Sequence, residues 1–237
     1  MTRIVVSVLL IGAASGLLGG TAGAWAQSAR VVEDFERYEV GTVPDRWVRV
    51  DGRNSVRPAS EALVPGERFE IRAEADNQFA RFATEDEYIR FSLRNGTEFE
   101  WDLQTHPRLK WRWRARQLPK GASEREKNDT GGAVYVTFGT DWLGRPKSIK
   151  YTYSSSLPVG TVVSFGPLKV IVVDSAREPR LGQWKTKVQH VRADYEQVFG
   201  QKPPDRPVSI TISGDSNTTG DTSEVDIDDL TLLPSNR

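Results

Sequence analysis

The 237-residue chain contains no cysteine, which excludes disulfides, zinc–thiolate sites, iron–sulfur clusters and thiol catalysis. Its stability must therefore come from an ordinary apolar core. Histidine is also scarce, with only His106 and His190 in the chain. Two histidines without cysteine give little basis for a transition-metal site.

The chain also lacks an excess of either charge, because 32 Lys and Arg balance 32 Asp and Glu. A protein that binds nucleic acid or membrane surfaces through general electrostatics needs a strongly basic balance, so we expect neither partner. No Gly-x-Ser-x-Gly elbow or glycine-rich phosphate loop is present. The chain has no internal repeat or low-complexity linker either, which favours one sizeable domain.

The apolar N-terminal segment is too short and too rich in glycine for a stable membrane anchor. Arg3 precedes an apolar run at 4–18, and Ala24 and Ala26 stand three and one residues before Gln27. This pattern predicts a secretory signal peptide over 1–26, cleaved after Ala26, and a single domain over 27–237. We therefore expect a periplasmic or secreted protein, and the absence of cysteine excludes a lipoprotein anchor.

What the chain does have is strict alternation, most clearly at 109–115 (Leu-Lys-Trp-Arg-Trp-Arg-Ala). This is the period of a half-buried strand. One face carries Trp111 and Trp113, which we expect in the core. The other face carries Arg112 and Arg114, a cationic row that needs water, acidic partners or a ligand.

Similar short runs between turn residues predict roughly a dozen strands and an antiparallel β-sandwich of the jelly-roll type. The first and last strands, 31–36 and 224–233, should lie side by side, and 51–60 should be a loop. At 183–199, apolar residues recur every three or four positions and Gly200 follows, which predicts one amphipathic helix. The other predicted strands are 47–50, 68–73, 78–83, 88–94, 109–115, 133–138, 148–154, 162–165, 169–174 and 208–213.

Several motifs resemble a family of exported bacterial proteins, the domain of unknown function 3047. They are Leu109–Arg114, Leu118–Ala122, Asn128-Asp129, Ile149–Ser154 with Leu157–Gly160, Asp194–Gly200 and Gly214–Thr218. The resemblance covers nearly all of 31–233 and implies an aromatic residue at Tyr153. It carries no established activity.

More loosely, the beginning at 33–36 and the end at 225–230 look like carbohydrate-binding jelly rolls. That resemblance implies sugar binding on one sheet and a structural calcium ion where the termini meet, although fold does not fix function. The motifs require no other cofactor. The oxygen ligands that calcium prefers would come from Glu33, Glu36, Asp226 and Asp228.

The first candidate site is a platform on which Arg112 and Arg114 meet Asp129 and residues of 148–154. Because side chains alternate along a strand, Lys150 points to the opposite face from Tyr151 and Tyr153. Either Lys150 or the two tyrosines, but not both, can therefore belong to the platform. Arginine forks suit carboxylates and sulfates, and aromatic rings stack on sugars. The alternative is a charged face paired with acids across strands.

Two loops offer further candidates. The loop with Glu124, Glu126 and Asp129 holds carboxylates that glycoside hydrolysis uses in pairs, or is simply a charged loop tip. The loop at 215–221, with Asp215 and Asn217, suits either calcium or an Asx-type turn.

These residues favour an exported, monomeric module that binds a carbohydrate, polysaccharide or other acidic small ligand. Two alternatives stay open. One is a polysaccharide-degrading enzyme, either a lyase or a glycoside hydrolase, since β-sandwich lyases use Arg, Lys, Tyr or His to neutralise a uronate and move a proton. The other is a structural envelope protein.

Overall fold

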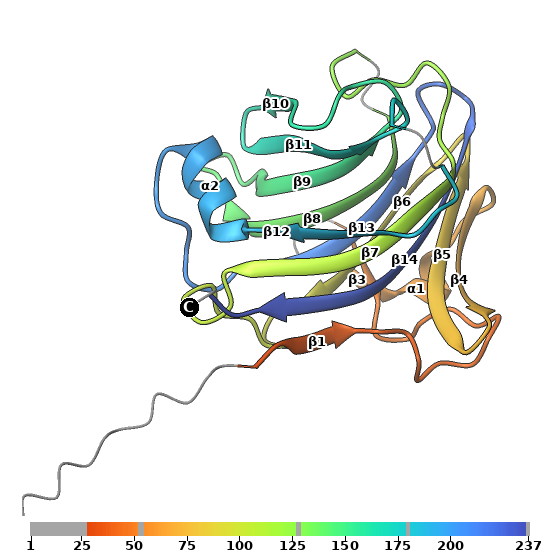
Figure 1. Ribbon diagram of the computed structural model, residues 1–237, viewed down its shortest axis with the longest axis horizontal. Helices are drawn as coiled ribbons and strands as arrows, with labels where there is room; N and C mark the ends of the chain where they lie inside the picture. The colour runs from red at the N-terminus through yellow and green to blue at the C-terminus, as the bar shows by residue number, and fades with distance from the viewer. Residues whose placement is uncertain (1–27, 52–54, 127–128, 179–180, 236–237) are drawn as a thin grey trace, which may run out of the picture.

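Two β-sheets pack face to face in the computed structural model, and the helix α2 (Val191–Phe199) lies at one end of them (Figure 1). The structure describes residues 28–51, 55–126, 129–178 and 181–235. The predicted signal peptide, 1–26, lies outside them. Neither described helix is long and apolar enough to cross a membrane.

The six-stranded sheet has the order β12-β7-β14-β5-β4, and β1 pairs with β14 beside this path. Its strands are β12 (Lys185–Gln189), β7 (Arg108–Gln117), β14 (Thr222–Leu233), β5 (Asn77–Glu85), β4 (Glu67–Glu74) and β1 (Arg30–Glu33). The antiparallel register of β1 and β14 places Arg30 opposite Leu232, which confirms that the first and last strands lie side by side.

The eight-stranded sheet has the order β10-β11-β9-β8-β13-β6-β2-β3. Its strands are β10 (Val162–Phe165), β11 (Leu168–Ser175), β9 (Pro146–Ser154), β8 (Thr130–Thr140), β13 (Ser209–Asp215), β6 (Tyr88–Arg94), β2 (Val48–Asp51) and β3 (Ser55–Pro58). The predicted mainly-β sandwich is confirmed, but this sheet is mixed. The chain returns through β10 and inserts β11 between β10 and β9, so β11 runs parallel to β9.

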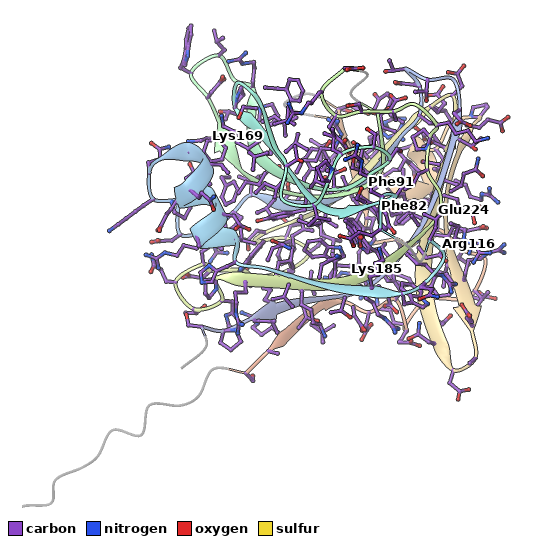
Figure 2. All side chains as sticks on the ribbon, turned by 45° about the horizontal axis from the view of Figure 1, so that its top comes forward. Phe82, Phe91, Arg116, Lys169, Lys185 and Glu224 are labelled. Atoms are coloured by element: carbon purple, nitrogen blue, oxygen red, sulfur yellow. The ribbon has the colours of Figure 1, made fainter. Side chains whose placement is uncertain are left out.

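Aromatic side chains from both sheets fill the space between the layers. Trp111 and Trp113 of β7 are fully buried, as predicted. Their rings meet Tyr151 and Tyr153 of β9, with centroid separations of 5.7 and 5.5 Å respectively. Phe82 of β5 and Phe91 of β6, labelled in Figure 2, are also fully buried.

The predicted helix at 183–199 is wrong in its first half. Residues 185–189 form β12 against the edge of β7, and only Val191–Phe199 form α2, with Gly200 as its left-handed C-cap. These residues pair with the open edge of β7 and form ion pairs with a buried partner. Such tertiary interactions outweigh the local helical spacing.

The predicted loop at 51–60 is also wrong. It contains β3, which pairs with β2. The one-turn helix α1 (Ala59–Ala62) follows β3 directly.

Candidate ligand-binding groove

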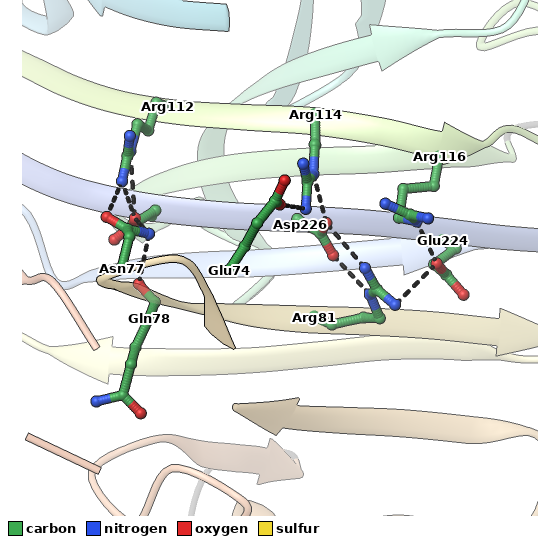
Figure 3. A network of polar contacts seen from close by, with 10 residues as sticks. Glu74, Asn77, Gln78, Arg81, Arg112, Arg114, Arg116, Glu224 and Asp226 are labelled. Atoms are coloured by element: carbon green, nitrogen blue, oxygen red, sulfur yellow. Dashed lines mark hydrogen bonds and ion pairs between the residues drawn. The ribbon is translucent and has the colours of Figure 1, made fainter. Parts of the chain in front are cut away.

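The arginine row of β7 is held in an ion-pair network on the outer face of the six-stranded sheet (Figure 3). The Arg112 guanidinium lies 2.5 Å from Asp228 and also donates to Asn77. The Arg114 guanidinium lies 2.7 Å from Asp226 and 2.5 Å from Glu74.

The same network continues across β5 and β14. Asp226 also binds Arg81 at 2.7 Å, and Glu224 binds Arg81 and Arg116 at 3.3 and 3.0 Å. The ring of Trp184 packs against both Arg112 and Arg114, with guanidinium carbons 5.0 and 4.7 Å from its centroid. This face therefore matches the alternative prediction, a charged surface whose arginines pair with acids on neighbouring strands, and not a ligand platform.

The predicted platform is wrong, because its members lie on different surfaces. Arg112 and Arg114 occupy the outer face of one sheet, Lys150 lies on the outer face of the other, and Tyr151 and Tyr153 are in the interior. The alternation correctly predicted which face of its strand each residue occupies. It could not predict which residues lie opposite on the neighbouring strands.

The other predicted residues have local partners. Asp129 accepts hydrogen bonds from the backbone N–H groups of Thr218 and Thr219 at 3.1 and 2.7 Å. It therefore holds the loop after β13. Asn217 is exposed in that loop. Asp215 is half-buried at the end of β13, where burial raises its pKa although Lys150 opposes the shift.

The four predicted calcium ligands do not form one cluster. Asp226 and Asp228 belong to the arginine network, whereas Glu33 accepts from Tyr38 and lies 3.3 Å from Arg46. Glu36 accepts from the backbone of Gln78. Among the described residues, no group of three or more His, Asp or Glu side chains is arranged to hold a metal ion.

A groove of about 940 Å³ runs over the outer face of the eight-stranded sheet. Strands β2, β6, β13, β8 and β9 contribute most of its lining, and Leu168 of β11 adds to it. The lining residues are Arg49, Val50, Asp51, Tyr88, Arg90, Ser92, Arg94, Tyr135, Thr137, Gly139, Thr140, Gly144, Pro146, Ser148, Leu168, Val208, Ser209 and Thr211.

The strand register explains why polar side chains gather there. Ser92, Thr211, Tyr135 and Lys150 stand opposite one another across four neighbouring strands. Their chain neighbours Phe91, Ile212 and Tyr151 point into the core. The Ser92 and Thr211 hydroxyls share a hydrogen bond of 2.7 Å, as do Thr137 and Ser148 at 2.9 Å in the next row.

Tyr135 lies at the centre of this surface between two cations. The Arg90 guanidinium carbon and the Lys150 Nζ lie 5.3 and 5.5 Å from its ring centroid. Burial alone would raise the pKa of Tyr135, but the charges of Lys150 and Arg90, with a hydrogen bond from Lys150, lower it below the ordinary 10.0. No carboxylate in the described part of the chain lies within ion-pair distance of either cation, although the half-buried Asp215 interacts electrostatically with both.

One end of this outer face is covered by the loop that follows β7. Glu124 in that loop is buried and accepts hydrogen bonds from Thr152 and Ser154 of β9, at 3.0 and 2.6 Å. Glu124 is thus an acceptor that fastens the loop to the sheet. The lining of the groove extends from β2 to the turn between β8 and β9 and does not include Lys150.

Sequence reasoning missed Arg90 and Tyr135 as site residues. Both lie in strands that were predicted, on the outward side that alternation assigns them. Their juxtaposition depends on β13, which pairs between β6 and β8 although it is more than 60 residues away in the chain. An outward tyrosine among β-branched residues at 134–137 was the available signal.

Some solved structures are similar to this chain at low sequence identity. A family 11 carbohydrate-binding module of a cellulosomal cellulase of Clostridium thermocellum has TM-score 0.43 and 12% identity, covering 88% of this chain and 95% of that one. An exo-beta-agarase has TM-score 0.45 and 11% identity, covering 88% of this chain and 25% of that one. The exolytic PL7 alginate lyase from Zobellia galactanivorans has TM-score 0.41 and 10% identity, covering 81% and 96%.

No curated protein matches the sequence. The family model described as a protein of unknown function (DUF3047) matches residues 61–231, and this confirms the resemblance seen in the motifs. The chain therefore belongs to the DUF3047 family.

Proposed function

We propose that the protein binds acidic oligosaccharides or polysaccharide segments in the groove over Tyr135. The observation that carries this proposal is the Arg90–Tyr135–Lys150 arrangement, in which two cations meet on one ring and share only the half-buried carboxylate of Asp215, which forms an ion pair with neither. An anionic group on a ligand would supply that missing charge.

The balance of charge within the groove favours an acidic ligand. Two other arginines of the lining are already matched, Arg49 by Glu67 and Arg94 by Glu98, each at 2.6 Å. Arg90 is exposed and available, and its planar fork suits a carboxylate or a sulfate ester. Because Lys150 is only 3% exposed, its attraction for an anion is screened less than that of a surface lysine.

The rest of the lining favours a sugar over a simple anion. The Ser92–Thr211 and Thr137–Ser148 pairs give rows of hydroxyls that can both donate to and accept from sugar hydroxyls. Tyr88, 44% exposed at the groove wall, offers an aromatic ring for the apolar face of a sugar. The groove, at about 940 Å³, has room for several linked rings.

Calorimetric titration with oligouronates, beside neutral oligosaccharides of equal length, tests the proposal. We expect the acidic ligands to bind more tightly. Changing Arg90→Ala removes a charged hydrogen bond of about 1.5–3 kcal/mol and should weaken their binding roughly ten- to hundredfold. Neutral ligands should be affected much less.

Arg72→Ala is the matched control. Arg72 is an exposed arginine of β4 on the outer face of the other sheet, so its loss changes the net charge equally. It should leave binding unchanged. Absence of binding to any acidic glycan, or an equal effect of both substitutions, would contradict the proposal.

A further inference from the structure

Trp142 projects from the turn between β8 and β9 and is 88% exposed, more than any other large apolar side chain that the structure describes. Surface exposure of an indole is costly and usually reflects a binding role when neighbouring groups are arranged around it. Leu143, beside it, is 52% exposed. The groove ends at this same turn, since Gly139, Thr140, Gly144 and Pro146 belong to its lining.

The turn that presents Trp142 is well ordered. The Asp141 carboxylate accepts from the backbone N–H groups of Leu143 and Arg145 at 3.0 and 2.8 Å. It also binds the Arg145 side chain at 2.7 Å, and Gly144 supplies the positive φ of 77° that closes the turn. Trp142 is therefore held outward by its own turn and needs little ordering to meet a ligand.

A second depression, of about 460 Å³, lies on the other side of this turn. Its lining includes Trp142, Lys147, Lys169 and Phe199, the last residue of α2. The ammonium groups of Lys147 and Lys169 lie 4.4 and 5.6 Å from the Phe199 ring centroid. Figure 2 labels Lys169 on the side of the molecule where α2 lies.

The charge pattern here repeats that of the groove. Within the described ranges, neither Lys147 nor Lys169 forms an ion pair with a carboxylate, whereas the third cation, Arg145, is matched by Asp141. Two cations that lack an ion-pair partner and lie against an aromatic ring are thus found both in the groove and in this depression. Thr140 lines both depressions, so the groove and the depression meet at the turn.

We infer that an acidic polysaccharide segment bound in the groove continues over the β8–β9 turn, stacks a sugar ring on Trp142 and places a further acidic group at Lys147 and Lys169. This inference rests on the proposed function and extends it to a ligand of greater length. A protein partner fits less well, because the exposed apolar surface at the turn is confined to Trp142 and Leu143 and is bordered by charge.

Binding of oligouronates of stepwise increasing length tests this path. Affinity should rise to a plateau when the groove is filled and rise again once the ligand reaches the turn. In Trp142→Ala we expect the second rise to shrink by about three- to tenfold, because one stacking contact is lost. Short ligands should bind the variant as they bind the unchanged protein.

Two further variants sharpen the result. Lys147→Ala combined with Lys169→Ala should also reduce the affinity of long ligands alone. Leu143→Ala, in the same turn, should change the affinity of neither short nor long ligands. Long ligands should perturb tryptophan fluorescence in the unchanged protein and less in Trp142→Ala. Short ligands that bind while longer ones gain nothing would overturn this inference and leave the proposed function intact. No binding at any length would refute the proposed function itself.

Discussion

Tyr135 shows how charge can dominate over burial at a single residue. Burial raises the pKa of Tyr151 and Tyr153, and the nearby carboxylates Asp194 and Asp174 add to that rise. Tyr135 is also buried, at 6% exposure, yet its pKa is lowered. The difference lies in its neighbours, since Lys150 and Arg90 both stabilise the phenolate.

The first prediction in solution concerns the ionisation of Tyr135. An ultraviolet titration of the folded protein should show a phenol that ionises below pH 10.0, and Tyr135→Phe should remove that component. Because folding lowers this pKa, the phenolate form favours the folded protein. That contribution is present above the unfolded pKa of 10.0 and is lost as the pH falls through the folded value.

Arg90→Ala provides the control, since it should shift the Tyr135 component toward higher pH without abolishing it. A phenol whose pKa is lowered, placed in a groove that can hold sugars, also suits the role of base in a polysaccharide lyase. The ligands recovered from the titrations can therefore be examined for unsaturated ends. Unchanged ligands would leave Tyr135 with an electrostatic role in binding.

Arg112 and Arg90 show what the sequence can and cannot predict about a site. Both alternate with buried apolar residues, so alternation assigns both to an outer face. The register then sets Arg112 opposite Asp228 and Arg114 opposite Asp226, whereas it sets Arg90 opposite Ser213. Arg112 and Arg114 are therefore neutralised by acids on the neighbouring strand and Arg90 is not, and only the strand pairing decides which.

At the scale of elements, most strands were predictable because each needs only its own alternation. The exceptions have non-local causes. Residues 185–189 carry helical spacing but pair with β7, and their lysines meet Asp174 of β11, a residue of the opposite sheet. No local pattern could reveal that buried carboxylate.

Asp174 should therefore be important for holding β12 in place. It is fully buried, lies 2.7 and 3.1 Å from the Lys185 and Lys187 ammonium groups, and accepts from the Trp113 indole at 3.2 Å. In Asp174→Ala we expect the free energy of unfolding to fall by about 3 kcal/mol. This loss is at the lower end of the range for breaking a buried ion pair, because both lysines are close enough to the surface to reach water.

Urea unfolding measures this loss. Asp174→Asn keeps an acceptor for Trp113 and should cost less. Asp51→Ala breaks an ion pair with Arg57 in which both side chains are more than 40% exposed, and it should cost below about 1 kcal/mol. Equal losses in the buried and the exposed pair would show that Asp174 does not fasten the two sheets.

For the whole molecule, zero net charge conceals an uneven distribution. The outer face of the six-stranded sheet has its arginines matched by Asp226, Asp228 and Glu224. On the outer face of the eight-stranded sheet, Arg90 and Lys150 form no ion pair with a described carboxylate and share only the nearby charge of Asp215. A neutral molecule exerts little attraction at long range, so anion binding must depend on these local cations.

This distribution predicts how salt will affect binding. Because salt screens exposed charges, acidic ligands should bind less tightly as the salt concentration rises. A short oligouronate that meets Arg90, with the buried Lys150 nearby, should lose affinity gradually, and a long one that also reaches Lys147 and Lys169 should lose it more steeply. Arg90→Ala should make the salt dependence shallower for both ligands, whereas Arg72→Ala should leave it unchanged. A salt dependence that ignores ligand length would mean that a diffuse field and not these four cations attracts the ligand.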